Sequence, residues 1–405
     1  MDLISIQDAV KIIQNHIPPV RTEQLSIEQA AGLVISQDVL ARDDSPPFTN
    51  SAMDGFAVKW SDVAGAKESN PVKLHIIGES RAGIPFHQPV EPGQAVQINT
   101  GAELPEGADT VVPVEHTLQE EDHVVITGVT GKGQFIRPAG AELKSGDVLC
   151  KAGTNLTPGC LGMLASQGFD SINIITRPRV SLVVTGSELI PYDLKPGPGQ
   201  IRDANSIMLT SVINASNAQI VFNTRTDDNI NAVRQGINKA ADAADLVIVS
   251  GGVSMGPHDL VKPAARKVGF EKLFWGVRQK PGKPLYVAKR EQTLLIGLPG
   301  NMVSTLNCYA FYILPVIKKM AGKTFEHKKV KAVMNKSFSN TDNRTLFLRV
   351  RLKTSGNKTM ATPFAKQDSH MLTSIGQAHG FILVEPNGTV EKNQKVEITL
   401  YPWSL

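Results

Sequence analysis

Three glycine-containing loops are candidates for binding chemistry: TGSE (185–188), SGGVSMG (250–256) and GLPGN (297–301). Each follows a short apolar run typical of a buried strand, and open α/β sheets bind ligands beyond the carboxyl ends of their strands. Glycine lets the backbone approach a ligand, and amides at a helix N-terminus, expected near Met302, favour an anion. The loops therefore predict a site for a phosphate-bearing ligand, unless their glycines only form tight turns. The candidate binding residues in these loops, or just after the third, are Gly186, Ser187, Ser250, Gly251, Gly252, Ser254, Pro299, Gly300 and Ser304.

Acidic residues lie at or just after the same turns. Carboxylates beside a phosphate repel it unless a cation lies between them, and such oxygen ligands suit Mg²⁺ or a similar divalent ion. The alternative for each single residue is a helix cap or an Asx-turn, and Asp203, just before Asn205 and Ser206, fits that description. The group as a whole predicts a divalent cation beside the phosphate. Its members are Glu188, Asp203, Asp227, Asp228 and Asp259, with Asp54 in a polar loop of the N-terminal half.

The segment KPGKP (280–284) supplies two cations, Lys280 and Lys283, each directly followed by a proline. Prolines reduce the entropy that is lost when the lysines are fixed on an anion, which favours a binding role. The alternative is a solvated turn.

The common nucleotide-binding signatures do not fit these loops. GGVSMG is followed by Pro257 and His258 where a P-loop has Lys and then Ser or Thr, and GLPG is not G-x-G-x-x-G. These differences argue against a P-loop NTPase and against a classical dinucleotide dehydrogenase.

The elements that position these residues can be read from the patterns around them. Strands alternate with helices from about residue 178 to 326, which predicts a parallel sheet covered on both faces, a three-layer α/β domain. Short β-rich runs with Gly/Pro turns fill 45–136 and predict a small, mostly β module. Similar runs after 327 predict a small barrel or sandwich. Helical spacing predicts short helices at 6–16 and 26–32 and a long one at 302–320.

Composition narrows the class of protein. A chain of 405 residues exceeds the ~250–300 at which single cores stop growing, so we expect several domains. A net charge of +4, from 42 basic and 38 acidic residues, provides no basic face for nucleic acid. The three cysteines show no CxxC spacing, and no run of about 18 apolar residues predicts a membrane span. We therefore expect a soluble, cytoplasmic protein.

Taken together, five segments resemble one family. They are PPFTNSAMDGFAV (46–58), INTGAELPEGADTVVPVE (98–115), TGSEL (185–189), GGVSMGPHD (251–259) and GLPGNMVS (297–304). They are similar to the motifs of the molybdopterin molybdenumtransferases, the MoeA family, which includes the E domain of gephyrin. The resemblance is collinear and spans essentially the whole chain.

The resemblance implies a homodimer of four-domain subunits. Domain I would be elongated, helical and β, and discontinuous at 1–44 and 137–176, with the mostly β domain II inserted at 45–136. Domain III, at 177–326, would be the α/β molybdopterin-binding domain, and domain IV, at 327–405, a β-barrel.

The resemblance also implies a reaction. The family takes adenylylated molybdopterin, hydrolyses its pyrophosphate with the help of a divalent metal, and transfers molybdate to the dithiolene with release of AMP. A molybdopterin adenylyltransferase and molybdoenzymes are the implied partners. The implied catalytic residues are Asp54, Thr100, Glu188, Asp228 and Asp259, joined by Lys280, Lys283, Pro299 and Ser304. Of these, Glu188 and Asp259 are assigned to the metal, and Asp54 and Thr100 to ordering molybdate or water from across the dimer.

Some positions depart from the family pattern: Thr49, Phe56, Gln97, Met302 and the turn 368–370. None of them removes a carboxylate or lysine assigned above. Two alternatives remain, a molybdopterin adenylyltransferase, which shares the α/β domain, and a non-catalytic scaffold built on the same fold.

Overall fold

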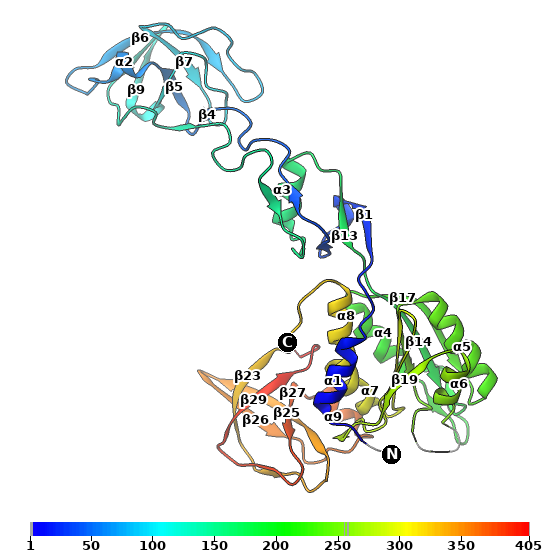
Figure 1. Cartoon of the computed structure of the whole chain (residues 1–405). Helices are drawn as coiled ribbons and strands as arrows, with labels where there is room; N and C mark the ends of the chain where they lie inside the picture. Colours follow the sequence, from blue (N-terminus) through cyan, green and yellow to red (C-terminus); the bar gives the residue numbers. More distant parts are fainter. Residues whose placement is uncertain (1–2, 255, 257–258, 405) are drawn as a thin grey trace. The chain divides into compact units, whose positions relative to one another are not determined.

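The computed structural model describes residues 3–254, 256 and 259–404, so positions 255, 257 and 258 of the 251–259 motif lie outside the described residues. The chain divides into two compact units (Figure 1). The first unit contains the residues up to Leu25, Ala30–Ser36 and the residues from Ile172 onward. The second unit contains Ser26–Gln29 and Gln37–Ser171.

A six-stranded sheet forms the centre of the first unit. Its order is β17 (Gln219–Thr226), β14 (Arg179–Thr185), β18 (Leu246–Ser250), β22 (Thr293–Leu298), β21 (Tyr286–Arg290) and β19 (Glu271–Trp275). The first four strands are parallel, and β21 and β19 add an antiparallel edge. The expected α/β domain is confirmed, although the sequence patterns did not indicate the antiparallel pair.

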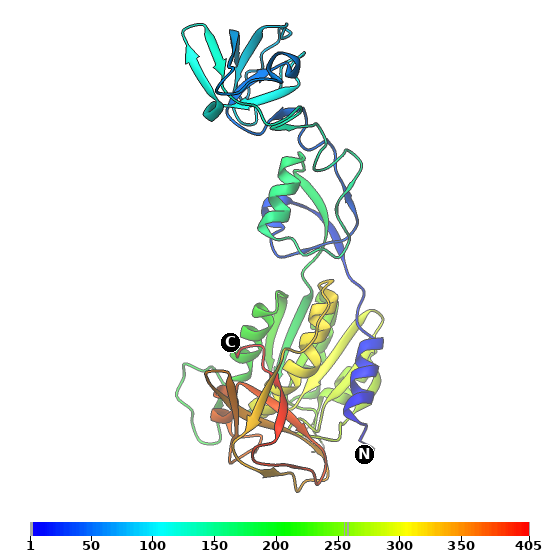
Figure 2. The ribbon, with the colours of Figure 1, turned by 90° about the vertical axis from the view of Figure 1, so that its left-hand side faces the viewer.

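Alternation along β14 explains why both faces of the sheet are covered. Leu182 and Val184 pack into one core cluster, while Val183 packs into another on the opposite face. The helices on the first face are α1 (Ile6–Asn15), α4 (Asn205–Ala215), α7 (Met302–Cys308) and α8 (Leu314–Met320). Helices α5 (Ile230–Ala243) and α6 (Val261–Lys267) cover the second face (Figure 1), and Figure 2 views the sheet from the side of the first face.

The predicted long helix at 302–320 is helical throughout but not uniform. A π-helical stretch, Tyr309–Ile313, separates α7 from α8. Pro315 has no N–H to donate to the preceding turn, which accounts for a wider turn at this place. The helix expected at 6–16 is confirmed as α1, which begins at Ile6 and is capped by Ser5, whose Oγ accepts the N–H of Asp8 at 3.0 Å.

Five strands close into a barrel in the C-terminal part of the first unit. Around the ring they are β25 (Thr345–Ser355), β26 (Lys358–Pro363), β23 (Lys329–Met334), β29 (Lys395–Leu400) and β27 (Gly380–Val384), and β27 pairs with β25 again. The barrel alternative is therefore correct and the sandwich is not. A short strand, β20 (Gln279–Lys280), pairs with β25 and so ties the KPGKP segment to the barrel.

The second unit contains the predicted β module as one six-stranded sheet. Its order is β8 (Thr110–Pro113), β5 (Gly55–Val58), β7 (Gln94–Ile98), β6 (Val72–Ser80), β10 (His123–Ile126) and β9 (Thr117–Glu120). Helix α2 (Trp60–Val63) packs on this sheet through Val63, and α3 (Pro158–Ser166) is capped by Thr157.

The prediction of a helix at 26–32 is wrong. Strand β1 (Thr22–Ser26) runs into this segment, and only one 3₁₀ turn, Ile27–Gln29, follows. Gly32 has a φ of +74°, in the left-handed region, so the chain turns before a second helical turn can form.

The remaining elements are short. They are β13 (Ser171–Ile175) and β2 (Val34–Ile35), which join β1 in one sheet, β3 (Val39–Leu40), β12 (Val148–Cys150), β4 (Asn50–Ser51), β11 (Ile136–Arg137), β15 (Leu189–Ile190), β16 (Ile201–Arg202), β24 (Phe338–Ser339), β28 (Thr389–Val390), α9 (Leu372–Gly376) and the 3₁₀ turn Val114–His116. No helix within the described residues is long and apolar enough to cross a lipid bilayer.

Candidate functional site

The three glycine loops start side by side. In the sheet register Val184 of β14 is opposite Ser250 of β18, and Ser250 is opposite Leu298 of β22. Because these strands are parallel, the loops that follow them leave the same edge of the sheet. The edge is the carboxyl edge, where α/β folds bind ligands.

A cavity of about 670 Å³ lies at this edge within the first unit. Its volume is within the usual range for a small-molecule site. The predicted site residues that line it are Glu188, Asp203, Gly252, Ser254, Asp259, Lys280, Lys283, Pro299, Gly300 and Ser304. Six others lie in the same loops or the loop after β17 without lining the cavity: Gly186, Ser187, Asp227, Asp228, Ser250 and Gly251. Asp54 and Thr100 belong to the second unit.

Close packing against the end of β14 requires glycine at the two positions that follow β18, Gly251 and Gly252. Gly251 has a φ of +93°, and a Cβ there would lie 2.5 Å from the carbonyl oxygen of Thr185. Gly252 has a φ of +62°, and its Cβ would lie 3.0 Å from Thr185 Oγ1. Both sites therefore need the left-handed freedom of glycine so that two loops can pack closely beneath the cavity.

Buried polar groups connect the loops at the base of the cavity. The Asn205 side-chain amide donates to Ser250 Oγ at 2.9 Å and to the Gly300 carbonyl at 2.7 Å. Two buried oxygens, Asn205 Oδ1 and Thr185 Oγ1, have no hydrogen-bond partner within the described residues. Since buried polar atoms are rarely left unpaired, and since Asn205 and Thr185 line the cavity, these oxygens indicate a place for a polar ligand or water.

Asp259 organises its own loop. One carboxylate oxygen accepts the N–H of Ser254 at 2.7 Å, and the other accepts the N–H of Gly256. Lys262 braces the same loop, because its ammonium donates to the Ser254 carbonyl at 2.6 Å and lies over the ring of Trp275. Each Asp259 oxygen retains a further lone pair, so the carboxylate can shape the loop and still bind a cation.

The cap alternative is correct for Asp203. Its Oδ1 accepts the N–H of Ser206 at 2.9 Å and its Oδ2 accepts the Ser206 hydroxyl at 2.5 Å, in the first turn of α4. Glu188 differs, because it is exposed and its carboxylate has no hydrogen bond within the described part of the chain. A Cβ at Gly186 would lie 2.8 Å from Glu188 Oε2, so this carboxylate lies back over Gly186.

Asp228 joins two strand ends. The Asp228 N–H donates to Ser187 Oγ at 2.9 Å, and the Ser187 N–H donates to Asp228 Oδ2 at 3.2 Å. This reciprocal pair links the loop after β14 to the loop after β17. Asp228 therefore helps to hold the loop that carries Glu188 in place.

The two lysines of the KPGKP segment have different surroundings. Lys280 forms an ion pair of 3.5 Å with Asp342, which also binds Arg344 at 2.7 Å. Hydrogen bonds from Arg344, and to a lesser extent the charges of Arg344 and Lys280, lower the pKa of Asp342 to about 2. The Lys283 ammonium has no ion pair or hydrogen bond among residues 3–254, 256 and 259–404, so it is available to an anion.

Replacing Asp342 by asparagine should lower the free energy of unfolding of the first unit by up to about 2 kcal/mol at neutral pH. The pKa is depressed in the folded state, so this stabilisation is complete above the ordinary value near 3.8 and disappears as the pH falls through about 2. Urea unfolding of both proteins between pH 2 and 7 measures this difference.

The matched control for this substitution is Glu397→Gln, which breaks an exposed pair with Lys329 and should change stability little. A difference between wild type and Asp342→Asn that stays constant over the whole pH range would contradict the assignment.

Several cavity residues were not predicted from the sequence. Arg344, Asp368, Ser369 and His370 come from the barrel region, and Arg202 precedes Asp203. The barrel turn is joined to the GLPGN loop by a hydrogen bond of 3.1 Å from the Asn301 amide to Ser369 Oγ. Asn301 therefore does not cap α7 with its side chain, which leaves the first amides of α7 available beside the cavity.

Asp54 and Thr100 form a pair in the second unit. Asp54 Oδ1 accepts the Thr100 N–H at 2.6 Å and the Thr100 hydroxyl at 3.0 Å. The backbone N–H first, and then the hydroxyl, lower the pKa of Asp54 below its ordinary value. Two sequence motifs, SAMDG and INTGA, are thus connected through these two residues.

Replacing Thr100 by valine should raise the pKa of Asp54 without restoring its ordinary value, because the stronger donor, the backbone N–H, remains. Titration of the Asp54 carboxyl carbon by NMR measures the change. Thr127→Val, which removes a hydroxyl that donates to the His116 carbonyl, is the control and should leave Asp54 unaffected. An unchanged pKa of Asp54 in Thr100→Val would show that the hydroxyl does not contribute.

The fold and the cavity define a class of protein: a multidomain chain whose α/β domain has a cavity at its carboxyl edge, lined by glycine loops, carboxylates and lysines. Three family descriptions match in order. They are "MoeA N-terminal region (domain I and II)" at residues 4–168, "Probable molybdopterin binding domain" at 181–319 and "MoeA C-terminal region (domain IV)" at 331–401.

Relatives of full length agree with these matches. A molybdopterin molybdenumtransferase of Bacillus subtilis is 30% identical over 99% of this chain and 97% of its own length. One from Haemophilus influenzae is 32% identical over 98% of each chain. The crystal structure of a molybdopterin biosynthesis MoeA protein from Pyrococcus horikoshii superposes with a TM-score of 0.86 at 28% identity, covering 98% of this chain and 99% of that one. The chain belongs to the MoeA family, the molybdopterin molybdenumtransferases.

Proposed function

We propose that this chain is the transferase that inserts molybdate into adenylylated molybdopterin, hydrolysing the pyrophosphate and releasing AMP in molybdenum cofactor biosynthesis. The observation that supports this most is the shared cavity at the carboxyl edge of the α/β sheet, where glycine loops, carboxylates and cations meet. Family membership supplies the substrate class, and the cavity supplies the chemistry that a diphosphate needs.

Binding of the diphosphate is assigned to groups that offer N–H or positive charge. The amides at the start of α7 and the Ser304 hydroxyl lie on one side of the cavity, and Lys283 is free to pair with a phosphate. Lys280 and Arg344 reach the same cavity while held by Asp342. Pyrophosphate hydrolysis depends on charge neutralisation and positioning more than on a covalent nucleophile, which is what these groups provide.

The carboxylates fit a divalent cation such as Mg²⁺. Mg²⁺ binds through one or two carboxylates together with phosphate oxygens and waters. Both carboxylate oxygens of Glu188 are available to a metal ion, because they accept no hydrogen bond within the described residues. Asp259 keeps a lone pair on each oxygen after its two backbone hydrogen bonds. Glu188 and Asp259 would hold the ion, which would neutralise charge on the diphosphate. We assign Asp228 to holding the Glu188 loop, and the Asp54–Thr100 pair to ordering molybdate or water.

We extend the proposal to the assembly and the domains. The chain acts as a cytoplasmic homodimer, in line with family membership and with its three free cysteines. Its domains are I (1–44 and 137–176), II (45–136), III (177–326) and IV (327–405). The family matches support the limits proposed for domains III and IV, because they end at 168 and 319 and resume at 181 and 331.

The test is an assay of the purified protein with adenylylated molybdopterin. AMP release that requires molybdate and a divalent ion supports the proposal. Formation of adenylylated molybdopterin from ATP would instead identify an adenylyltransferase, and absence of both reactions would favour a scaffold. Omission of molybdate is the internal control, since slow spontaneous hydrolysis does not depend on it.

A further inference from the structure

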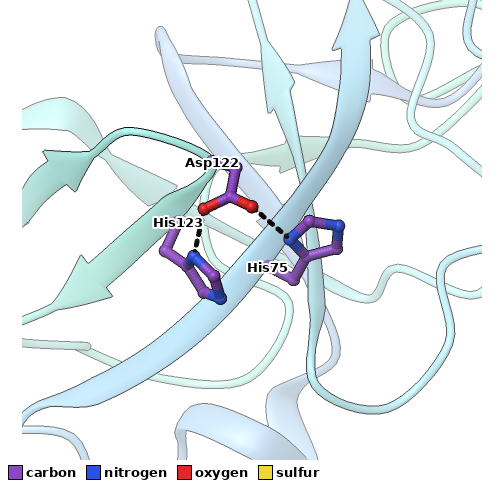
Figure 3. A group of neighbouring side chains, drawn as sticks. All are labelled: His75, Asp122 and His123. Atoms are coloured by element: carbon purple, nitrogen blue, oxygen red, sulfur yellow. Dashed lines mark hydrogen bonds and ion pairs between the residues drawn. The ribbon is translucent and has the colours of Figure 1, made fainter.

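A second group of possible ligands lies outside the cavity, on the β sheet of the second unit. His75 is on β6 and His123 on β10, and the antiparallel register places them directly opposite each other. Their neighbours Leu74 and Val124 are buried, so the two imidazoles project from the opposite, solvent-facing side. Asp122 precedes β10 and lies between the two rings (Figure 3).

The three side chains converge on one point. One ligand atom from each of His75, Asp122 and His123 lies within 4.8 Å of the other two. Asp122 contacts His123 Nδ1 at 2.5 Å and His75 Nδ1 at 3.8 Å, and the ring centroids are 5.2 Å apart.

The set of donors determines which ion would fit. Two imidazole nitrogens and one carboxylate are typical ligands of zinc and neighbouring transition metals, whereas Mg²⁺ prefers oxygen ligands. Bonds of 2.0–2.2 Å place tetrahedral ligand atoms about 3.3 Å apart. The side chains of His75, His123 and Asp122 are 50%, 35% and 65% exposed, so small rotations can close the remaining distance without disturbing the core.

We propose that His75, Asp122 and His123 form a surface site for one divalent transition-metal ion of the zinc type, with water completing its coordination. The ion joins β6 to β10 and so stabilises the sheet of the second unit. The site uses none of the residues of the cavity, and it is independent of the proposed transferase reaction.

The experiment is a Zn²⁺ titration of the full-length protein by calorimetry, with Mg²⁺ present in excess to occupy oxygen-rich sites. Wild type should bind Zn²⁺, and His75→Ala and His123→Ala should each raise the dissociation constant at least about 10-fold. His87→Ala is the matched control, since His87 is an exposed histidine of the same unit outside the cluster. It should bind like wild type.

A second readout covers the case in which a variant is poorly folded. In wild type, Zn²⁺ should shift the NMR signals of the His75 and His123 rings and slow hydrogen exchange in β6 and β10. The proposal is overturned if wild type does not bind Zn²⁺ under these conditions. It is also overturned if His75→Ala and His123→Ala retain wild-type affinity, or if the ring signals do not move.

Discussion

Replacing Asp259 by alanine should lower molybdate-dependent AMP release by at least about 100-fold. Two effects add in this variant. The N–H groups of Ser254 and Gly256 lose their acceptor, so the loop beside the cavity loses its shape. The cavity also loses a carboxylate that, with Glu188, would hold a divalent ion. The rate under saturating substrate, measured with purified protein, gives the size of the loss.

A comparison with Asp259→Asn separates the two effects. Asparagine can still accept one of the two N–H groups, but it has no charge to offer a cation. If the charge is what matters, both variants lose activity alike, whereas a requirement for loop shape alone would leave the asparagine variant partly active. Glu271→Ala, at an exposed position on the edge strand β19, is the control and should be unaffected. Turnover of Asp259→Ala close to wild type would eliminate the proposed role.

The carboxyl edge of the sheet was predictable, because the sequence patterns that define it lie within short segments of the chain. Buried apolar runs such as 179–185 identify the strands, and parallel strands bring the loops that follow them to one edge. Glu188 and Asp259 could therefore be placed together from sequence alone, and both line the cavity. The same reasoning explains why the cap at Asp203 was foreseen, since it depends only on residues three positions apart.

The barrel residues in the cavity were not predictable, because nothing local specifies them. Arg344 and Ser369 reach the cavity only because β20 pairs with β25 and because Asn301 bonds to Ser369. Both are contacts between segments that are far apart in the sequence. The alternation of apolar and polar residues along a short strand does not indicate which other strand it pairs with. The reason for glycine at 251 was also not foreseen, since the clash that excludes a side chain comes from Thr185 in another loop.

Replacing Gly251 by alanine should destabilise the first unit by about 3 kcal/mol. The backbone at 251 has a φ of +93°, which L side chains rarely adopt. The new Cβ would also lie 2.5 Å from the Thr185 carbonyl oxygen, a backbone atom that cannot move without bending the end of β14. Strain and overpacking therefore act together.

Gly300→Ala is the matched control, because Gly300 lies at the neighbouring strand end and lines the same cavity. Apart from the adjacent residues, the atom nearest to a Cβ at 300 would be the Gly251 Cα at 3.8 Å, and the backbone is outside the left-handed region. This variant should change stability by less than about 1 kcal/mol. Native-state hydrogen exchange of the β14 and β18 amides reports on this unit separately from the other, which a single melting temperature does not. Equal loss of protection in the two variants would show that the packing of the two loops is not what requires glycine at 251.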